Sequence, residues 1–144
     1  MKLFYISIIC FFCSGFVSAQ STLKLEYLNV LEAAYVHPTT REMDTTQFKI
    51  RVSFNIDSIQ YTQRLEVTFK LSDYDVLKVV DCPVVMKENK YYVRSVDKEF
   101  VQVYSAYASF EIPVDWQVWK QTRQVIIKAY GDSNMESNLI VYKR

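Results

Sequence analysis

VIIKAYGDSNMESNLIVYKR (Val125–Arg144) closes the chain and contains two apolar, β-branched runs with a polar tip between them. The first run ends at Tyr130, and the second spans Leu139–Tyr142. The tip, Gly131–Ser137, mixes acidic, amide and hydroxyl side chains, which favour turns because they hydrogen-bond the nearby backbone. This stretch therefore predicts an antiparallel hairpin.

Strict alternation of apolar and polar residues continues the β pattern in the middle of the chain. It extends over Gln47–Ile56 and again over Arg64–Leu71. Such alternation is typical of antiparallel strands that bury one face and expose the other. Because only the short polar segment DSIQYTQ separates the two strands, we expect them to pair as a hairpin.

Further segments have the composition of strands but a looser pattern: Leu23–Tyr27, Val76–Val80, Val84–Met86, Tyr91–Val96 and Phe100–Ile112. Polar turns such as KENK separate them, and His37–Thr46 is expected to be a loop. With the two closing strands this gives roughly eight strands, which predicts a single all-β domain built as an antiparallel sandwich.

One segment breaks the strand pattern. Pro113 disfavours a central strand, and Trp116 and Trp119 follow it three residues apart. We therefore expect Val114–Gln121 to be a crossover between the two sheets, with one helical turn.

Met1–Ala19 has the features of a secretory signal peptide. A basic Lys2 precedes an uncharged apolar run that ends in small residues, so we expect cleavage before Gln20. An uncleaved membrane anchor is the alternative, but the run is barely long enough for a bilayer core of roughly 30 Å, and no basic cluster follows it. Lipid attachment at Cys10 or Cys13 is disfavoured because bulky residues precede both cysteines.

The expected mature domain, residues 20–144, is electrically balanced. The chain has 17 basic and 16 acidic residues, and of these only Lys2 lies in the signal segment. This balance argues against nucleic acid or anionic lipid as a partner. No membrane span remains after cleavage. Cys82 is the only cysteine left, so no intrachain disulfide can form, and stability must come from a packed core.

Few residues of the mature domain could carry chemistry. His37 is the only histidine, Gly131 is the only glycine, and no nucleophile-elbow or phosphate-binding glycine motif is present. A zinc site needs several cysteine or histidine ligands, and the domain has one of each. Asp81 next to Cys82 disfavours a reactive thiolate, which predicts a buried structural cysteine, with intermolecular pairing as the alternative. We therefore predict a non-enzymatic protein without catalytic residues, cofactor or metal.

Three pairs of carboxylates that are close in sequence remain candidates for acid–base groups: Asp73/Asp75, Asp97/Glu99 and Asp132/Glu136. Most such residues solvate turns, and no pair shows a sign of a raised pKa. A calcium site at Asp132, Asn134 and Glu136 has the right alternation of oxygen ligands. It lacks the second glycine and the distant bidentate glutamate of a full calcium loop.

Aromatic residues are the most unusual feature of the composition, at 15% of the chain. Large rings normally fill the core of a small β domain. The alternative is that some form a surface for a protein or a glycan, because aromatic residues are enriched at interfaces. The candidate partner-binding residues are Tyr104, Tyr107, Trp116 and Trp119.

The closing hairpin resembles the last two strands of a fibronectin type III or related immunoglobulin-like domain. In that family a strand ending in Ala-Tyr or Ala-Val leads to an Asp, then to a Gly-Asn-Glu-Ser-like turn and the closing strand. This chain has AYGD at residues 129–132, NMESN at residues 134–138 and LIVY at residues 139–142, with Met135 where a glycine would be expected. The resemblance implies an immunoglobulin-like β-sandwich at residues 20–144 but no function.

These features favour an exported binding or structural protein of a Gram-negative bacterial envelope. It would be periplasmic, outer-membrane-associated or extracellular, and would act as a subunit or adaptor through a sheet face or edge. Its partner would be another envelope protein. A small carbohydrate-binding module that uses exposed Tyr or Trp side chains is the alternative, and an unrecognised hydrolase is a third hypothesis.

Overall fold

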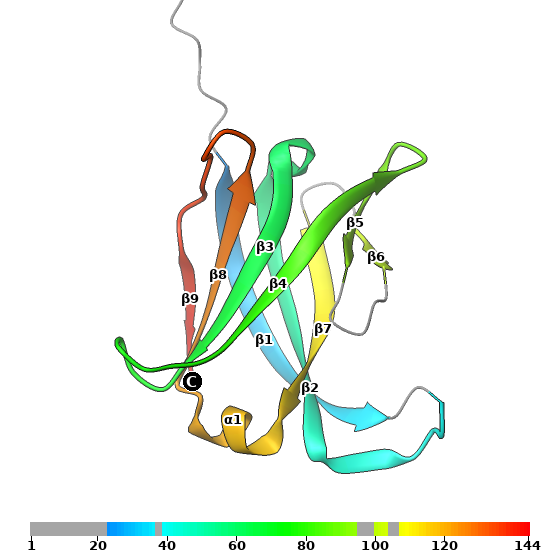
Figure 1. Ribbon diagram of the computed structural model, residues 1–144, viewed down its shortest axis with the longest axis vertical. Helices are drawn as coiled ribbons and strands as arrows, with labels where there is room; N and C mark the ends of the chain where they lie inside the picture. The colour runs from blue at the N-terminus through cyan, green and yellow to red at the C-terminus, as the bar shows by residue number, and fades with distance from the viewer. Residues whose placement is uncertain (1–22, 37–38, 95–99, 104–106) are drawn as a thin grey trace, which may run out of the picture.

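Nine strands form two antiparallel sheets in the computed structural model, which describes residues 23–36, 39–94, 100–103 and 107–144 (Figure 1). The three-stranded sheet has the order β1-β2-β7, and the six-stranded sheet has the order β6-β5-β4-β3-β8-β9. The strands are β1 (Lys24–Val36), β2 (Met43–Asp57), β3 (Thr62–Lys70), β4 (Val76–Lys87), β5 (Lys90–Arg94), β6 (Phe100–Gln102), β7 (Tyr107–Asp115), β8 (Gln124–Gly131) and β9 (Ile140–Lys143). The all-β, two-sheet prediction is confirmed.

β2 and β3 do not pair with each other, so the hairpin predicted across DSIQYTQ is wrong. β2 pairs with β1 and β7, whereas β3 pairs with β4 and β8. Between them Ser58 adopts a left-handed conformation with φ of 60°, and a 3₁₀ turn follows at Ile59–Tyr61. Ile59 is buried in the core, so this connection crosses from one sheet to the other. Alternation shows that each strand has one buried face, but not which strand lies beside it.

β1 and β2 extend farther than predicted and form a long hairpin. β1 continues to Val36, which pairs with Met43 at the start of β2. Residues 43–46, predicted as part of a loop, therefore belong to a strand. His37 and Pro38 lie outside the described residues. The described residues of the connection, Thr39–Glu42, are exposed.

Two other boundaries differ from the predictions. The segments Val76–Val80 and Val84–Met86 belong to one strand, β4, because the chain continues in extended form through Cys82. The long strand predicted at Phe100–Ile112 is divided between the two sheets, with β6 in one and β7 in the other. The KENK turn is confirmed, since β4 and β5 pair on either side of it. Glu88 and Asn89 both have positive φ there, as a two-residue hairpin turn requires.

Pro113 lies inside β7, which is possible because β7 is an edge strand. The Lys78 ammonium group on β4 donates a hydrogen bond of 3.0 Å to the Pro113 carbonyl oxygen. The chain then enters α1 (Trp116–Gln121), where the Asp115 side chain accepts a hydrogen bond of 2.7 Å from the Gln117 amide. The helical turn predicted in the crossover is therefore confirmed, although it begins only after the strand reaches Asp115.

The core fills the space between the sheets with the inward residues of the alternating strands. Its largest fully buried side chains are Trp119, Phe54, Phe69, Leu25, Ile50, Ile56, Leu65, Ile112 and Ile127. Most of them come from the two segments in which alternation was strictest, β2 and β3. This confirms that alternation identified the buried face of each strand.

β8 and β9 form the closing hairpin that the sequence predicted, in the register Gln124↔Lys143 to Ile127↔Ile140. The left-handed residues of its tip are Ser133 and Asn134, with φ of 53° and 62°, whereas Gly131 has no positive φ. Glycine is needed at position 131 for space, because a Cβ atom there would lie 2.4 Å from the Tyr61 carbonyl oxygen. The backbone of η1 (Ile59–Tyr61) thus packs directly on this hairpin.

Replacing Gly131 with alanine is expected to lower the free energy of unfolding by about 1–3 kcal/mol, because a backbone atom must move to admit the methyl group. Urea denaturation of Gly131→Ala against the unmodified chain measures this loss. Asn134→Gly is the matched control and should be neutral or slightly stabilising, since glycine adopts its left-handed conformation without strain. A Gly131→Ala variant as stable as the parent would contradict the close approach.

Candidate binding face

The four aromatic residues predicted as a partner-binding set do not form one surface. Trp119 is only 2% exposed and belongs to the core. Its ring packs edge-on against Phe69, with centroids 6.4 Å apart. It therefore cannot contact a partner in this fold, which corrects its place in the set. Tyr104 lies outside the described residues.

Tyr107 and Trp116 are exposed but lie far apart. Tyr107 begins β7 and is 46% exposed, and Trp116 follows the other end of that strand and is 37% exposed. They are nine positions apart along an extended chain, a span of about 30 Å. Trp116 also rests on Phe48, with ring centroids 4.8 Å apart. The structure does not bring these rings together into a platform.

The two tryptophans should therefore respond differently to substitution. Trp119→Ala is expected to lower the free energy of unfolding by about 3–5 kcal/mol, because it empties a large buried site. Trp116→Ala serves as the matched control and should cost about 1–2 kcal/mol, since part of its ring already contacts water. Denaturant unfolding followed by far-UV circular dichroism measures both values. Equal losses would contradict the assignment of Trp119 to the core.

A row of β-branched side chains, three of them apolar and one a threonine, crosses the outer face of the six-stranded sheet. The register places Val79 of β4 beside Thr68 of β3, Thr68 beside Ile126 of β8, and Ile126 beside Val141 of β9. The residues that flank these four along their strands mostly point inward, so the four point outward. Val79 is 50% exposed and Val141 43% exposed. We call this the middle row.

Polar rows lie on either side of the middle row, and the three rows together are called the binding face. The upper row contains Asp81, Glu66 and Lys128, which pair across β4, β3 and β8, together with Glu136, which forms an ion pair with Lys128. The lower row contains Val76, Lys70, Gln124 and Lys143, which pair across β4, β3, β8 and β9. An apolar centre between charged margins is the usual anatomy of a protein interface.

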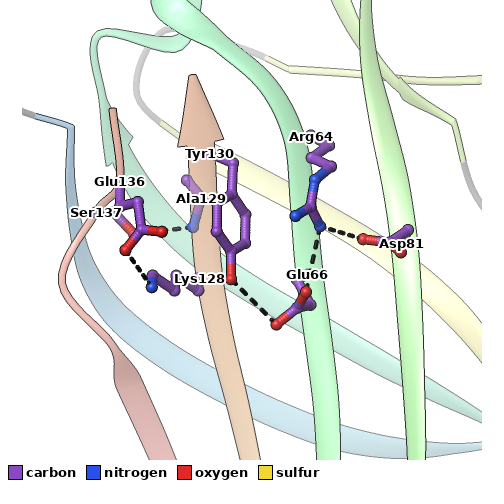
Figure 2. A network of polar contacts seen from close by, with 8 residues as sticks. All are labelled: Arg64, Glu66, Asp81, Lys128, Ala129, Tyr130, Glu136 and Ser137. Atoms are coloured by element: carbon purple, nitrogen blue, oxygen red, sulfur yellow. Dashed lines mark hydrogen bonds and ion pairs between the residues drawn. The ribbon is translucent and has the colours of Figure 1, made fainter. Parts of the chain in front are cut away.

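Hydrogen bonds fix the upper row in one arrangement (Figure 2). Arg64 forms ion pairs with both Asp81 and Glu66, the latter at 3.2 Å. Its guanidinium carbon lies 3.9 Å from the centroid of the Tyr130 ring, and the Tyr130 hydroxyl reaches Glu66 at 3.4 Å. These contacts link neighbouring strands β4, β3 and β8 through their side chains.

The tip of the closing hairpin is attached to the same network. The pKa of Lys128 is raised because its ammonium group is hydrogen-bonded to Glu136. Next to it, the Ala129 amide donates to the Ser137 hydroxyl at 2.8 Å, and the Ser137 amide donates to the Ala129 carbonyl at 2.9 Å. The segment after the tip therefore continues the sheet beside β8, where β9 has not yet begun.

The outer face of the three-stranded sheet is more polar. Arg51 and Lys49 of β2 both pair with Glu111 of β7, at 2.7 and 3.4 Å. These contacts lower the pKa of the Glu111 carboxyl, chiefly through the hydrogen bond from Arg51. Leu31 of β1 lies beside Arg51 and is an isolated exposed apolar residue in this row. This face provides matched control positions for the binding face.

The carboxylate pairs that the sequence left open are engaged in local contacts or lie outside the described part. Asp73 accepts a hydrogen bond from Gln124, and Asp75 accepts one from Ser72. Asp132 accepts one from Gln63. Asp97 and Glu99 are outside the described residues, as is His37. Among the residues that the structure describes, no three acidic, cysteine or histidine side chains are grouped so as to hold a metal ion.

Cys82 is fully buried, as the sequence predicted. Burial, together with the smaller effect of the neighbouring Asp81 carboxylate, raises the pKa of its thiol from 9.0 to about 12. The thiol therefore stays protonated across the physiological range and is neither a nucleophile nor accessible for disulfide exchange in the folded chain.

The free energy of unfolding should fall as the pH rises above 9.0, the ordinary pKa of the Cys82 thiol. In that range the unfolded chain releases the Cys82 proton and the folded chain retains it, so ionisation favours unfolding. Below that pKa the thiol is protonated in both states and contributes no pH dependence. Urea denaturation from about pH 8 to about pH 10.5 measures the effect, and Cys82→Ala, which lacks this titration, should lose less stability over the same range. If the free energies of unfolding of the two proteins fell equally with pH, the assigned role of the Cys82 thiol would be refuted.

Comparisons with known proteins gave no relative for this chain. No family model matches, and neither the curated proteins nor the solved structures contain a match. None of the helices in the described ranges is long and apolar enough to cross a membrane. A proposal for the function therefore rests on the geometry of the binding face.

Sequence reasoning missed the middle row, although one signal was present. Val125, Ile126 and Ile127 are consecutive apolar residues in a strand whose neighbours alternate strictly. Side chains of a strand alternate between faces, so a run of three places its central member on the face opposite the other two, which here is the outer face. Val79 and Val80 are adjacent apolar residues, so one of the two lies on the outer face.

Proposed function

We propose that this chain is an exported, non-enzymatic binding or structural protein of a bacterial envelope, and that it binds another protein through the outer face of its six-stranded sheet. The middle row is the observation that carries this proposal. Four apolar or β-branched side chains on four neighbouring strands form a stripe, and charged side chains border it on both sides. Most surface apolar residues occur singly, and a row of this kind favours a protein partner.

The order of the strands supports an immunoglobulin-like domain for this function. If β1, β2 and β7 are named A, B and E, and β3, β8 and β9 are named C, F and G, the pairings A-B-E and C-F-G are those of that family. β4, β5 and β6 then extend the second sheet beyond C. Domains of this architecture commonly act by presenting a sheet face or edge to a partner, although the fold itself does not specify one.

A glycan platform has less support from the described residues. Tyr107 and Trp116 are separated by the length of β7. Tyr130 lies on the binding face, but its ring is covered by Arg64 and approached by Lys128 at 4.9 Å. A sugar would have to displace these cations before it could stack on the ring.

Export itself is tested by the mass of the protein recovered from the envelope. The signal segment, which lies outside the described residues, predicts that the mature chain begins at Gln20. Mass spectrometry of the protein purified from its native host should show this start. A full-length chain that begins at Met1 and stays in the cytoplasm would contradict export.

Partner binding is tested by affinity capture from envelope extracts with variants of the middle row. Ile126→Lys places a charge at the centre of the row and should reduce recovery of a stoichiometric protein partner by about tenfold or more. Leu31→Lys, on the outer face of the other sheet, is the matched control and should leave capture unchanged. Val141→Lys is a second variant at a more exposed position, in case Ile126→Lys unfolds. Equal capture by all variants, or recovery of polysaccharide alone, would overturn the proposal.

A further inference from the structure

The charge pattern of the binding face is complementary to itself. Its upper row has three carboxylates, on Asp81, Glu66 and Glu136, and two cations contact them: Lys128, paired with Glu136, and Arg64, paired with Asp81 and Glu66. Its lower row has two ammonium groups, on Lys70 and Lys143, and one carboxylate, on Asp73, accepts a hydrogen bond from Gln124 of this row. Carboxylates thus outnumber cations by one (three against two) on one side of the middle row, and cations outnumber carboxylates by one (two against one) on the other.

We propose that a second copy of this chain covers the binding face, with the two six-stranded sheets stacked about a twofold axis that runs along the middle row. This inference rests on the proposed function, because it names the partner of the same surface. In a twofold interface each copy contributes the same patch, so a surface must be complementary to itself. The described rows meet that condition.

The register specifies which charges would meet. Thr68 lies on the axis, and Glu66 and Lys70 lie two residues away on either side along β3. Rotation about the middle row therefore places Glu66 of each copy opposite Lys70 of the other. The same rotation brings Glu136 toward Lys143, while the middle rows of the two copies pack against each other.

The alternative axis, parallel to the strands, is disfavoured by the same charges. It would keep each row opposite itself, so rows with the same sign of net charge would face each other; Asp81 of one copy would approach Glu136 of the other, and the contact of Glu66 with Lys128 would offset only part of that repulsion. Two carboxylates facing each other across an interface oppose association. The axis along the middle row instead places the net negative row of each copy opposite the net positive row of the other.

The size of the face predicts a weak dimer. Four strands spaced about 4.8 Å apart, with three rows of residues, cover on the order of a few hundred Å². Stable specific interfaces bury about 800 Å² on each partner. We therefore expect reversible association at micromolar or higher concentration, and weaker association as salt screens the charges at the margins.

Sedimentation equilibrium of the purified chain, with charge reversals, tests the proposal. The unmodified chain should dimerise, and Lys70→Glu or Glu66→Lys alone should raise the dimer dissociation constant by about tenfold or more, because each places like charges opposite one another. An equimolar mixture of the two variants should associate again, since each supplies the charge that the other lacks. Arg51→Glu, on the other sheet, is the matched control and should dimerise like the parent.

A chain that stays monomeric at all concentrations, or a mixture that associates no better than its components, would overturn the inference. Circular dichroism of each variant establishes that it is folded before the comparison is made. If the chain is monomeric but still captures an envelope protein in a manner sensitive to Ile126→Lys, self-association fails and the proposed function stands. If that capture also fails, both are wrong.

Discussion

Trp119 closes one end of the space between the two sheets, and the rest of the fold depends on that closure. Its ring packs on Phe69 of β3, and its indole nitrogen donates a hydrogen bond of 2.8 Å to Glu32 of β1. Arg144 lies over the ring at 4.4 Å and donates to the Trp119 carbonyl oxygen at 2.7 Å. One residue of the short helix thus joins the first strand, a central strand of the other sheet and the end of the chain.

The two sheets are also joined along their sides by polar contacts. The Asn138 side chain accepts from the Leu25 amide at 2.8 Å and donates to the Leu25 carbonyl at 2.9 Å, which ties β1 to the segment before β9. On the other side Lys78 reaches the Pro113 carbonyl of β7. Both contacts use backbone groups of edge strands, those of Leu25 in β1 and Pro113 in β7. Unpaired backbone groups at a sheet edge can pair with a further strand. This leaves the outer faces as the more available surfaces for a partner.

Alternation in the sequence was enough to predict the class of fold and the buried face of the main strands, but not their partners. Ile50, Val52 and Phe54 were identified as inward because side chains of a strand change face at every residue. That pattern does not distinguish a hairpin from a connection that crosses between sheets. The strand pairings and the burial of Ile59 show that the chain crosses between β2 and β3. Gly131 is a similar case, because its need for glycine comes from Tyr61, which is distant in sequence.

The candidate site was harder to predict for a related reason. Aromatic composition indicated Trp116 and Trp119, yet the helix places one at the surface and the other in the core. The middle row exists only when Val79, Thr68, Ile126 and Val141 are aligned by the register of four strands. Register depends on pairing between segments far apart in the chain, which local patterns do not specify.

The charged rows of the binding face contribute little to folding, which separates their role from that of the core. Exposed ion pairs such as Arg64–Glu66 are worth about 0–1 kcal/mol, because water screens them and both side chains lose mobility. Burial of a single core side chain contributes about 1.5–3 kcal/mol. A loss of association after charge reversal in these rows would therefore reflect the surface rather than a general loss of stability.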